Sequence, residues 1–181
     1  MEIVIKMEKI KNVWHWWWGW NTEKVENWLE EMERNGWNLT KVDFFQVRFT
    51  FKKGKARKMR YCWDYPSMPG ENYFELFKED GWESMDNKLG PWFIWGKPYG
   101  EERPNLYTDT KSLIEKNNRQ IRTVIFGVVL TLFLIAIVSF VNFSFSKWIS
   151  ALLFLSMVFY GYIIVKLCQY NKKLKTNAIK C

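Results

Sequence analysis

Histidine and cysteine are scarce in this sequence. His15 is the only histidine, so neither a histidine-based metal site nor a Ser-His-Asp triad can be assembled. The three cysteines, Cys62, Cys168 and Cys181, are odd in number and far apart, and their spacing predicts neither a disulfide framework nor a zinc site. Free thiols are typical of a reducing cytosol. We therefore expect no metal and no cofactor.

Recognisable catalytic patterns are also lacking. The glycines are scattered and do not form a phosphate-binding loop. Asp43, Asp64 and Glu75 are candidates for acid–base chemistry by residue type alone, but their spacing selects none of them. The N-terminus has no apolar run long enough for a signal peptide, so residues 1–120 are not expected to be exported. We expect a protein without catalytic activity.

Acidic residues are absent from the last third of the chain. All 19 lie at or before Glu115, whereas lysine is the only charged residue type after Arg122. Most of the net charge of +8 therefore lies beside long hydrophobic segments. A basic protein of this kind is a candidate for nucleic-acid binding, but here the position of the charge favours a membrane-topology signal. No nucleic-acid partner is expected.

Two long hydrophobic runs are present near the C-terminus. No charged residue occurs between Val124 and Ser146, or between Trp148 and Val165. Each run is long enough to cross about 30 Å of hydrocarbon as a helix, and the alternative is a buried helical pair in a soluble protein. Because Lys147 is the only charge between them, the positive-inside rule predicts a transmembrane hairpin with both chain ends cytoplasmic. The expected partner is the lipid bilayer of a bacterial cell membrane.

The expected organisation has six parts. They are a cytoplasmic α+β aromatic-rich domain (1–105), a juxtamembrane helix (106–122), transmembrane helix 1 (123–143), an external turn (144–147), transmembrane helix 2 (148–168) and a basic cytoplasmic tail (169–181). A helix is expected to begin near Thr110, with a capping box from Ser112 to Glu115, and to continue into the first span.

Residues 13–97 contain an internal repeat of strand, helix, Gly-Trp and two short strands. The first helix is expected over residues 22–35, with an apolar face of Val25, Trp28, Leu29 and Met32, and it ends at Gly36. The second helix follows Pro69-Gly70, ends at Gly81 and has an apolar face of Tyr73, Phe74, Leu76 and Phe77. A duplicated β-α-β-β unit predicts a ferredoxin-like antiparallel sheet with two helices on one face, followed by the two-helix transmembrane hairpin.

Strand signals lie between these helices. Phe45, Val47, Phe49 and Phe51 alternate with polar residues, a period of two that is typical of a half-buried strand. The sequence Lys52-Lys53-Gly54-Lys55 predicts a hairpin turn. The partner strand is then expected to contain Met59, Tyr61 and Trp63.

Tryptophan is unusually abundant before residue 100. In a strand, Trp14, Trp16 and Trp18 face one side, whereas His15 and Trp17 face the other. One interpretation is a large aromatic core; the other is an exposed face that binds a protein partner, an apolar ligand or the membrane interface. The candidate binding face comprises Trp14, Trp16, Trp18, Trp63, Trp92 and Trp95.

A second candidate surface is basic. It comprises Lys52, Lys53, Lys55, Arg57, Lys58 and Arg60. The alternatives are a solvated hairpin tip, a patch that docks on anionic lipid headgroups, and a nucleic-acid contact.

Three short sequence motifs resemble those of a known family. They are Trp28, Leu29, Met32, Gly36, Trp37 and Leu39; then Tyr61, Asp64 and Tyr65; and then Glu75, Leu76, Phe77, Gly81 and Trp82. Together they resemble the domain of unknown function 2812 over residues 10–110, and the run Trp14–Trp18 departs from that pattern. The resemblance implies a bacterial protein that often carries C-terminal membrane spans and is often encoded beside PadR-type transcriptional regulators.

The expected function is that of a membrane-anchored cytoplasmic sensing or regulatory module. Its aromatic sheet face would bind a ligand or a protein partner. A homo-oligomer is also considered, with the hairpin as the oligomerisation surface. The alternative is a small immunity or envelope-stress protein that acts through its transmembrane hairpin.

Overall fold

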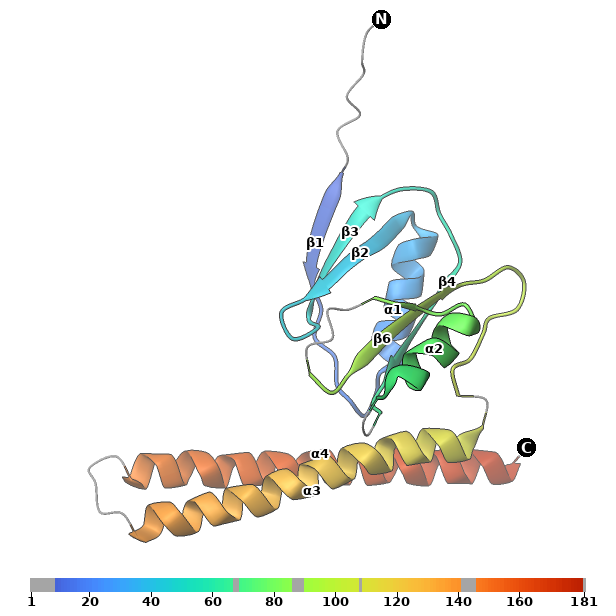
Figure 1. Cartoon of the computed structure of the whole chain (residues 1–181). Helices are drawn as coiled ribbons and strands as arrows, with labels where there is room; N and C mark the ends of the chain where they lie inside the picture. The colour runs from blue at the N-terminus through green and yellow to red at the C-terminus, as the bar shows by residue number, and fades with distance from the viewer. Residues whose placement is uncertain (1–8, 67–68, 86–89, 108, 141–145, 181) are drawn as a thin grey trace, which may run out of the picture. The chain divides into compact units, whose positions relative to one another are not determined.

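The chain folds into two units. A computed structural model describes residues 9–66, 69–85, 90–107, 109–140 and 146–180. The N-terminal unit ends at Leu106 and the C-terminal unit begins at Tyr107 (Figure 1). The N-terminal unit is α+β with two small antiparallel sheets, and the C-terminal unit is a pair of long helices.

The first sheet contains β1 (Ile10–Trp14), β2 (Trp37–Asp43) and β3 (Arg48–Lys53), with β3 in the centre. Phe49 and Phe51 on β3 are fully buried, whereas Arg48 and Thr50 lie on the outer face. This is the predicted alternation, and it arises because successive side chains of a strand point to opposite faces.

The predicted hairpin turn at Lys52–Lys55 is wrong. The turn lies instead at residues 44–47, where β2 folds back on β3, so Phe45 and Val47 precede the strand. After Lys53 the chain leaves the first sheet and enters β4 (Met59–Asp64) of the second sheet. Strand-like alternation continued through the turn residues, and it therefore hid the reversal.

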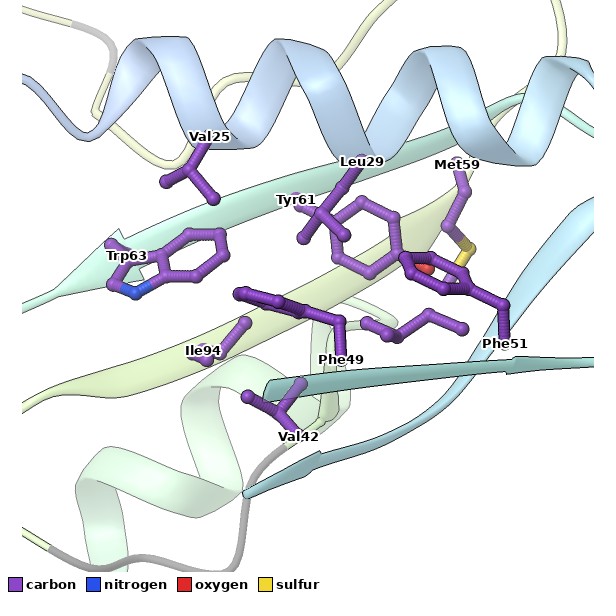
Figure 2. Close-up of a cluster of buried hydrophobic side chains, with 10 residues drawn as sticks. Val25, Leu29, Val42, Phe49, Phe51, Met59, Tyr61, Trp63 and Ile94 are labelled. Atoms are coloured by element: carbon purple, nitrogen blue, oxygen red, sulfur yellow. The ribbon is translucent and has the colours of Figure 1, made fainter. Parts of the chain in front are cut away.

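The second sheet contains β4, β5 (Glu83–Ser84) and β6 (Phe93–Pro98), with β6 in the centre. The expected single sheet is therefore two three-stranded sheets. Tyr61 and Trp63 of β4 belong to a core shared with the first sheet, as Figure 2 shows, whereas Cys62 belongs to a core under the second helix. Because both faces of β4 are covered, every residue of this strand is buried.

The first helix, α1 (Glu23–Arg34), begins and ends within a residue or two of its predicted bounds. Val25 and Leu29 are fully buried against both sheets (Figure 2), and Trp28 and Met32 pack at the edge of the same core. The predicted apolar face is confirmed.

The second helix, α2 (Glu71–Glu79), packs on the outer face of the second sheet. Tyr73, Phe74 and Phe77 contact the core of Cys62, Trp82, Phe93 and Trp95. Leu76 is 65% exposed and beside a shallow pocket, so its predicted place on the buried face is wrong. Tyr73 and Phe77 contact Trp95, and the helix is rotated so that Leu76 points outward.

Two glycines that end these helices have the predicted left-handed conformation. Gly36 has a φ of 72° and Gly81 a φ of 78°. A methyl group at Gly36 would lie 2.8 Å from the carbonyl oxygen of Gly54, whereas at Gly81 the nearest atom is 3.8 Å away.

Gly36→Ala is therefore expected to destabilise the N-terminal unit more than Gly81→Ala. The left-handed backbone costs about 1 kcal/mol at either site, and the clash with Gly54 raises the loss at Gly36 to about 2–3 kcal/mol. Urea denaturation followed by tryptophan fluorescence measures both. Equal losses at the two sites would contradict the close approach of Gly54.

The C-terminal unit contains α3 (Thr110–Phe140) and α4 (Ser146–Lys180), which pack antiparallel. The side chain of Asp109 accepts hydrogen bonds from the backbone N–H and the hydroxyl of Ser112, so Asp109 caps α3. The helix continues without a break from the predicted juxtamembrane segment into the first span, and α4 includes most of the predicted tail. The end of span 1 (residues 141–143) and residues 144–145 of the external turn lie outside the described residues.

Both helices are long and apolar enough to span a membrane. In the most apolar windows of α3 and α4, 6% and 0% of the residues are buried inside the protein. Helices of a soluble core bury such side chains, whereas membrane helices leave them for lipid. The chain therefore has the two candidate spans of a membrane protein.

Candidate functional site

The tryptophan run at the end of β1 presents alternate side chains to solvent. Trp14, Trp16 and Trp18 are exposed, and Trp16 is 67% exposed. Between them, His15 stacks on Trp28 with ring centroids 4.1 Å apart, and partial burial lowers the pKa of its imidazole. The predicted alternation is therefore present, although only Trp14 belongs to a regular strand.

Trp17 anchors the run to the N-terminal unit. Its ring contacts Trp63 and Trp92 at centroid distances of 5.6 and 5.1 Å. Its indole N–H donates a hydrogen bond of 2.8 Å to the carbonyl oxygen of Gln46. The residue that faces inward thus holds its exposed neighbours in place.

The turn between β2 and β3 adds two more exposed aromatic residues. Phe44 meets Trp14 edge-on at 5.0 Å, and Phe45 is 85% exposed beside it. On the other side, Trp18 contacts Trp16 at 5.7 Å and Trp20 at 4.8 Å. We name these residues the aromatic ridge: Trp14, Trp16, Trp18, Trp20, Phe44 and Phe45. Sequence reasoning missed Phe44, and it assigned Phe45 to a strand.

The turn that carries Phe44 and Phe45 has a strained backbone, and hydrogen bonds to its neighbours hold it in place. Phe44, Phe45 and Gln46 have φ angles of 50°, 55° and 62°, a region that costs a non-glycine residue about 1–2 kcal/mol. Gln46 is buried and donates a side-chain hydrogen bond of 2.9 Å to the carbonyl oxygen of Trp92. The backbone N–H of His15 donates to the carbonyl oxygen of Val47 at 2.9 Å. Strained bulky residues that the surroundings hold in place are typical of functional sites.

Basic side chains flank the ridge on the outer face of the first sheet. The guanidinium of Arg48 lies 6.0 Å from the ring centre of Trp14. Lys41 is ion-paired with Asp43 at 2.9 Å, and Lys52 lies further along β3. Three cations accompany one carboxylate here, so the surface beside the ridge is positive.

The other predicted tryptophans are not on this surface. Trp63 and Trp95 are fully buried in the two cores, because α1 and α2 cover opposite faces of the second sheet. Trp92 is half-buried beneath Trp17 and Tyr65. The six residues of the candidate face therefore do not form one surface. Trp14, Trp16 and Trp18 are exposed, Trp63 and Trp95 are buried, and Trp92 is half-buried.

The predicted basic patch also divides. Arg60 is only 7% exposed, so it is not a surface residue. Arg57 forms an ion pair with Glu33, Lys53 donates to the carbonyl oxygen of Asn35, and Lys58 donates to that of Gly100. The remaining members are Lys52, near the end of the central strand β3, and Lys55, in the connection after it. Both arginines pair with carboxylates of α1, but only Arg60 is buried, and Arg57 stays exposed.

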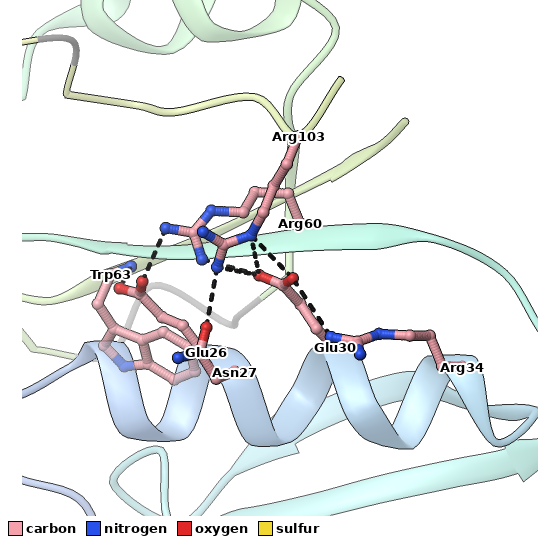
Figure 3. Close-up of polar contacts among 7 residues, drawn as sticks. All are labelled: Glu26, Asn27, Glu30, Arg34, Arg60, Trp63 and Arg103. Carbon is pink, nitrogen blue, oxygen red and sulfur yellow. Dashed lines mark hydrogen bonds and ion pairs between the residues drawn. The ribbon is translucent and has the colours of Figure 1, made fainter. Parts of the chain in front are cut away.

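These carboxylates form a buried acidic stripe on α1, which sequence reasoning missed. Glu26, Glu30 and Glu33 lie at i, i+4 and i+7, on one face of the helix. The guanidinium of Arg60 bridges Glu26 at 3.0 Å and Glu30 at 2.8 Å (Figure 3). Arg103 from the segment after β6 binds both oxygens of Glu30. The spacing of the glutamates was the available signal, but it is also that of a solvated helix face.

Glu33 accepts hydrogen bonds from four groups. They come from Arg57 at 2.6 Å, the Tyr61 hydroxyl at 2.6 Å, the Leu39 backbone N–H at 2.7 Å and the Asn38 amide at 2.7 Å. Burial alone would raise the pKa of Glu33, but these donors outweigh it and hold the pKa below its ordinary value. Burial and the carboxylate together raise the pKa of Tyr61. A carboxylate that is ionised at neutral pH and bonded to four donors is suited to structure rather than proton transfer.

The three carboxylates considered for catalysis lie on different elements. Asp43 is at the end of β2 in its ion pair, and Glu75 is exposed on α2. Asp64 ends β4 and accepts hydrogen bonds from the Tyr73 hydroxyl at 2.7 Å and the Tyr65 backbone N–H. Within the described part of the chain, no cluster of histidine, cysteine or carboxylate side chains is placed to hold a metal ion.

Comparisons with known proteins give one match. Neither the curated proteins nor the solved structures contain a significant match to this chain. A family model described as "Protein of unknown function (DUF2812)" matches residues 21–130. The match begins after the tryptophan run and extends into α3, further toward the C-terminus than the resemblance indicated. Because it covers more than half of the sequence, the chain belongs to the DUF2812 family.

Proposed function

We propose that this chain is a membrane-anchored regulatory module that works by binding rather than by catalysis. The observation that carries the proposal is the aromatic ridge, whose tryptophan and phenylalanine side chains are exposed except for the half-buried Trp20 and lie on a strained, hydrogen-bonded support. Soluble surfaces rarely maintain such a group without a binding role, because exposed aromatic area promotes nonspecific association.

The segment after β6 is anchored on the N-terminal unit and leads into the membrane helices. Arg103 is held on Glu30 and Asn27 of α1, and Leu106 packs on the core under α2. Only residues 107–109 separate Leu106 from the start of α3. A change in the N-terminal unit would therefore act on α3 through a short, anchored connection.

The orientation follows from charge. We place both chain ends on the cytoplasmic side, because lysines follow the second apolar run and only Lys147 lies between the runs. The family resemblance points to bacteria and to transcription as the output. We also interpret the N-terminal unit as a duplicated β-α-β-β. The strand orders are β1-β3-β2 and β4-β6-β5, so in each sheet the third strand along the chain lies in the centre.

The test is complementation of a deletion strain of the source organism, with transcript profiles as the readout. The wild-type chain should restore the profile, and the full-length double variant Trp16→Ser with Phe45→Ser should not. Leu76→Ser is the matched control, because Leu76 is also an exposed apolar residue but lies on α2.

The result also separates the two candidate functions. Restoration by the double variant would overturn the ridge as the functional surface. Restoration by the membrane hairpin alone, expressed from residue 107, would favour the immunity or stress protein that acts within the bilayer. Equal abundance of all variants in the membrane fraction is the condition for the comparison.

A further inference from the structure

The composition of the aromatic ridge matches the interfacial zone of a bilayer. Four of its members are tryptophans and two are phenylalanines, and none carries a charge. Tryptophan concentrates at the headgroup level of membranes, where its ring is apolar and its N–H remains solvated.

The positive charge around the ridge favours a negatively charged binding partner. Arg48 lies against Trp14, and Lys41 and Lys52 share its sheet face with the single carboxylate of Asp43. Anionic lipid headgroups complement this arrangement. A second copy of the chain, docked ridge to ridge, would instead bring Arg48 toward its own symmetry mate in a self-complementary contact.

Chain length keeps the N-terminal unit close to the membrane helices. Leu106 packs on the core under α2, and α3 begins at Thr110. Residues 110–122 precede the apolar part of α3 and span about 20 Å at 1.5 Å per residue, and residues 107–109 add at most about 10 Å. A surface on such a short tether meets the bilayer at a high effective concentration, so even weak lipid contacts are populated.

We propose that the aromatic ridge inserts into the interfacial zone of an anionic leaflet of the same membrane that holds α3 and α4. This inference rests on the proposed binding function and names its partner. Phe45 at the tip of the strained turn and Trp16 are the deepest residues, while Arg48 and Lys52 remain at the phosphate level.

The test uses the full-length chain in nanodiscs, one copy per disc. Phe45→Cys is labelled with a polarity-sensitive fluorophore in a Cys168→Ser, Cys181→Ser background, and Cys62 is left in place because it is buried. The matched control carries the label at Asn72→Cys, on the exposed side of α2. Discs contain phosphatidylcholine alone or equal parts of phosphatidylglycerol and phosphatidylcholine, with nitroxide quencher on the acyl chains.

The label at position 45 should be quenched by the lipid nitroxide and shielded from aqueous iodide in anionic discs, and the label at position 72 should not. Arg48→Gln and Lys52→Gln should each shift the equilibrium between docked and free states by about fivefold toward the free state. A label at Trp16→Cys repeats the measurement without altering the turn.

Two results would overturn the proposal. Equal iodide access at positions 45 and 72 in every bilayer would show that the ridge does not enter lipid. Protection that appears only with two copies per disc would assign the ridge to self-association. In both cases the complementation test still decides independently whether the ridge is a functional surface.

Discussion

Glu33→Gln is expected to lower the free energy of unfolding of the N-terminal unit by about 3 kcal/mol. Glu33 is fully buried, and its two oxygens accept hydrogen bonds from Arg57, Tyr61, Asn38 and the backbone of Leu39. Glutamine has one acceptor oxygen, and its NH2 group would face groups that themselves donate hydrogen bonds. At least one buried donor therefore loses its acceptor. Urea denaturation measures the loss, and tryptophan fluorescence reports on this unit because 11 of the 12 tryptophans precede residue 100.

Glu31→Gln is the matched control for this prediction. Glu31 lies on the same helix but is exposed, so its replacement should change the free energy of unfolding by less than about 0.5 kcal/mol. Similar losses at the two positions would mean that helix propensity, rather than the buried carboxylate, sets the stability.

A pH series distinguishes the charge of Glu33 from its shape. Its folded-state pKa is below the ordinary value of 4.5, so its contribution is fully present above that pH. The contribution is lost as the pH falls through the folded-state pKa, because the unfolded chain binds the proton more readily. The wild-type unit should therefore lose stability below about pH 4.5, and Glu33→Gln should show a shallower dependence.

Sequence patterns predicted the features of this fold that depend on local periodicity. The apolar face of α1 with Val25 and Leu29 follows from helical spacing, and the exposure of Trp14, Trp16 and Trp18 alternates as in a strand, although β1 ends at Trp14. Gly36 and Gly81 marked helix ends because few other residues adopt a positive φ readily.

Features that depend on long-range contacts were not predictable in this way. Arg60 follows four lysines and Arg57 closely in the sequence, so it resembles a surface residue, yet its partners Glu30 and Glu26 lie 30 and 34 positions away. The sequence around Trp63 likewise does not distinguish it from the exposed tryptophans. Trp63 is buried because α1 and the first sheet cover β4. The reversal at Phe44 carries no glycine or proline, so no turn signal marked it.

Arg60→Met is expected to destabilise the N-terminal unit by about 3–5 kcal/mol. Arg60 is buried between Glu26 and Glu30, at 3.0 and 2.8 Å, and methionine fills its volume without its charge. Removing one partner of a buried ion pair leaves an uncompensated charge, which is far more costly than removing the whole pair. Arg34→Met is the matched control, because Arg34 also reaches Glu30, at 4.0 Å, but is largely exposed. Its replacement should cost less than about 1 kcal/mol.

The carboxylate left without a cation in Arg60→Met is that of Glu26, because Glu30 keeps its three hydrogen bonds from Arg103. Adding Glu26→Gln should therefore recover part of the lost stability, since the amide oxygen still accepts the backbone N–H of Trp63. In the double-mutant cycle, the Glu26→Gln change is then destabilising with Arg60 present and stabilising in the Arg60→Met background. Additive losses would show that Glu26 and Arg60 do not act as a pair.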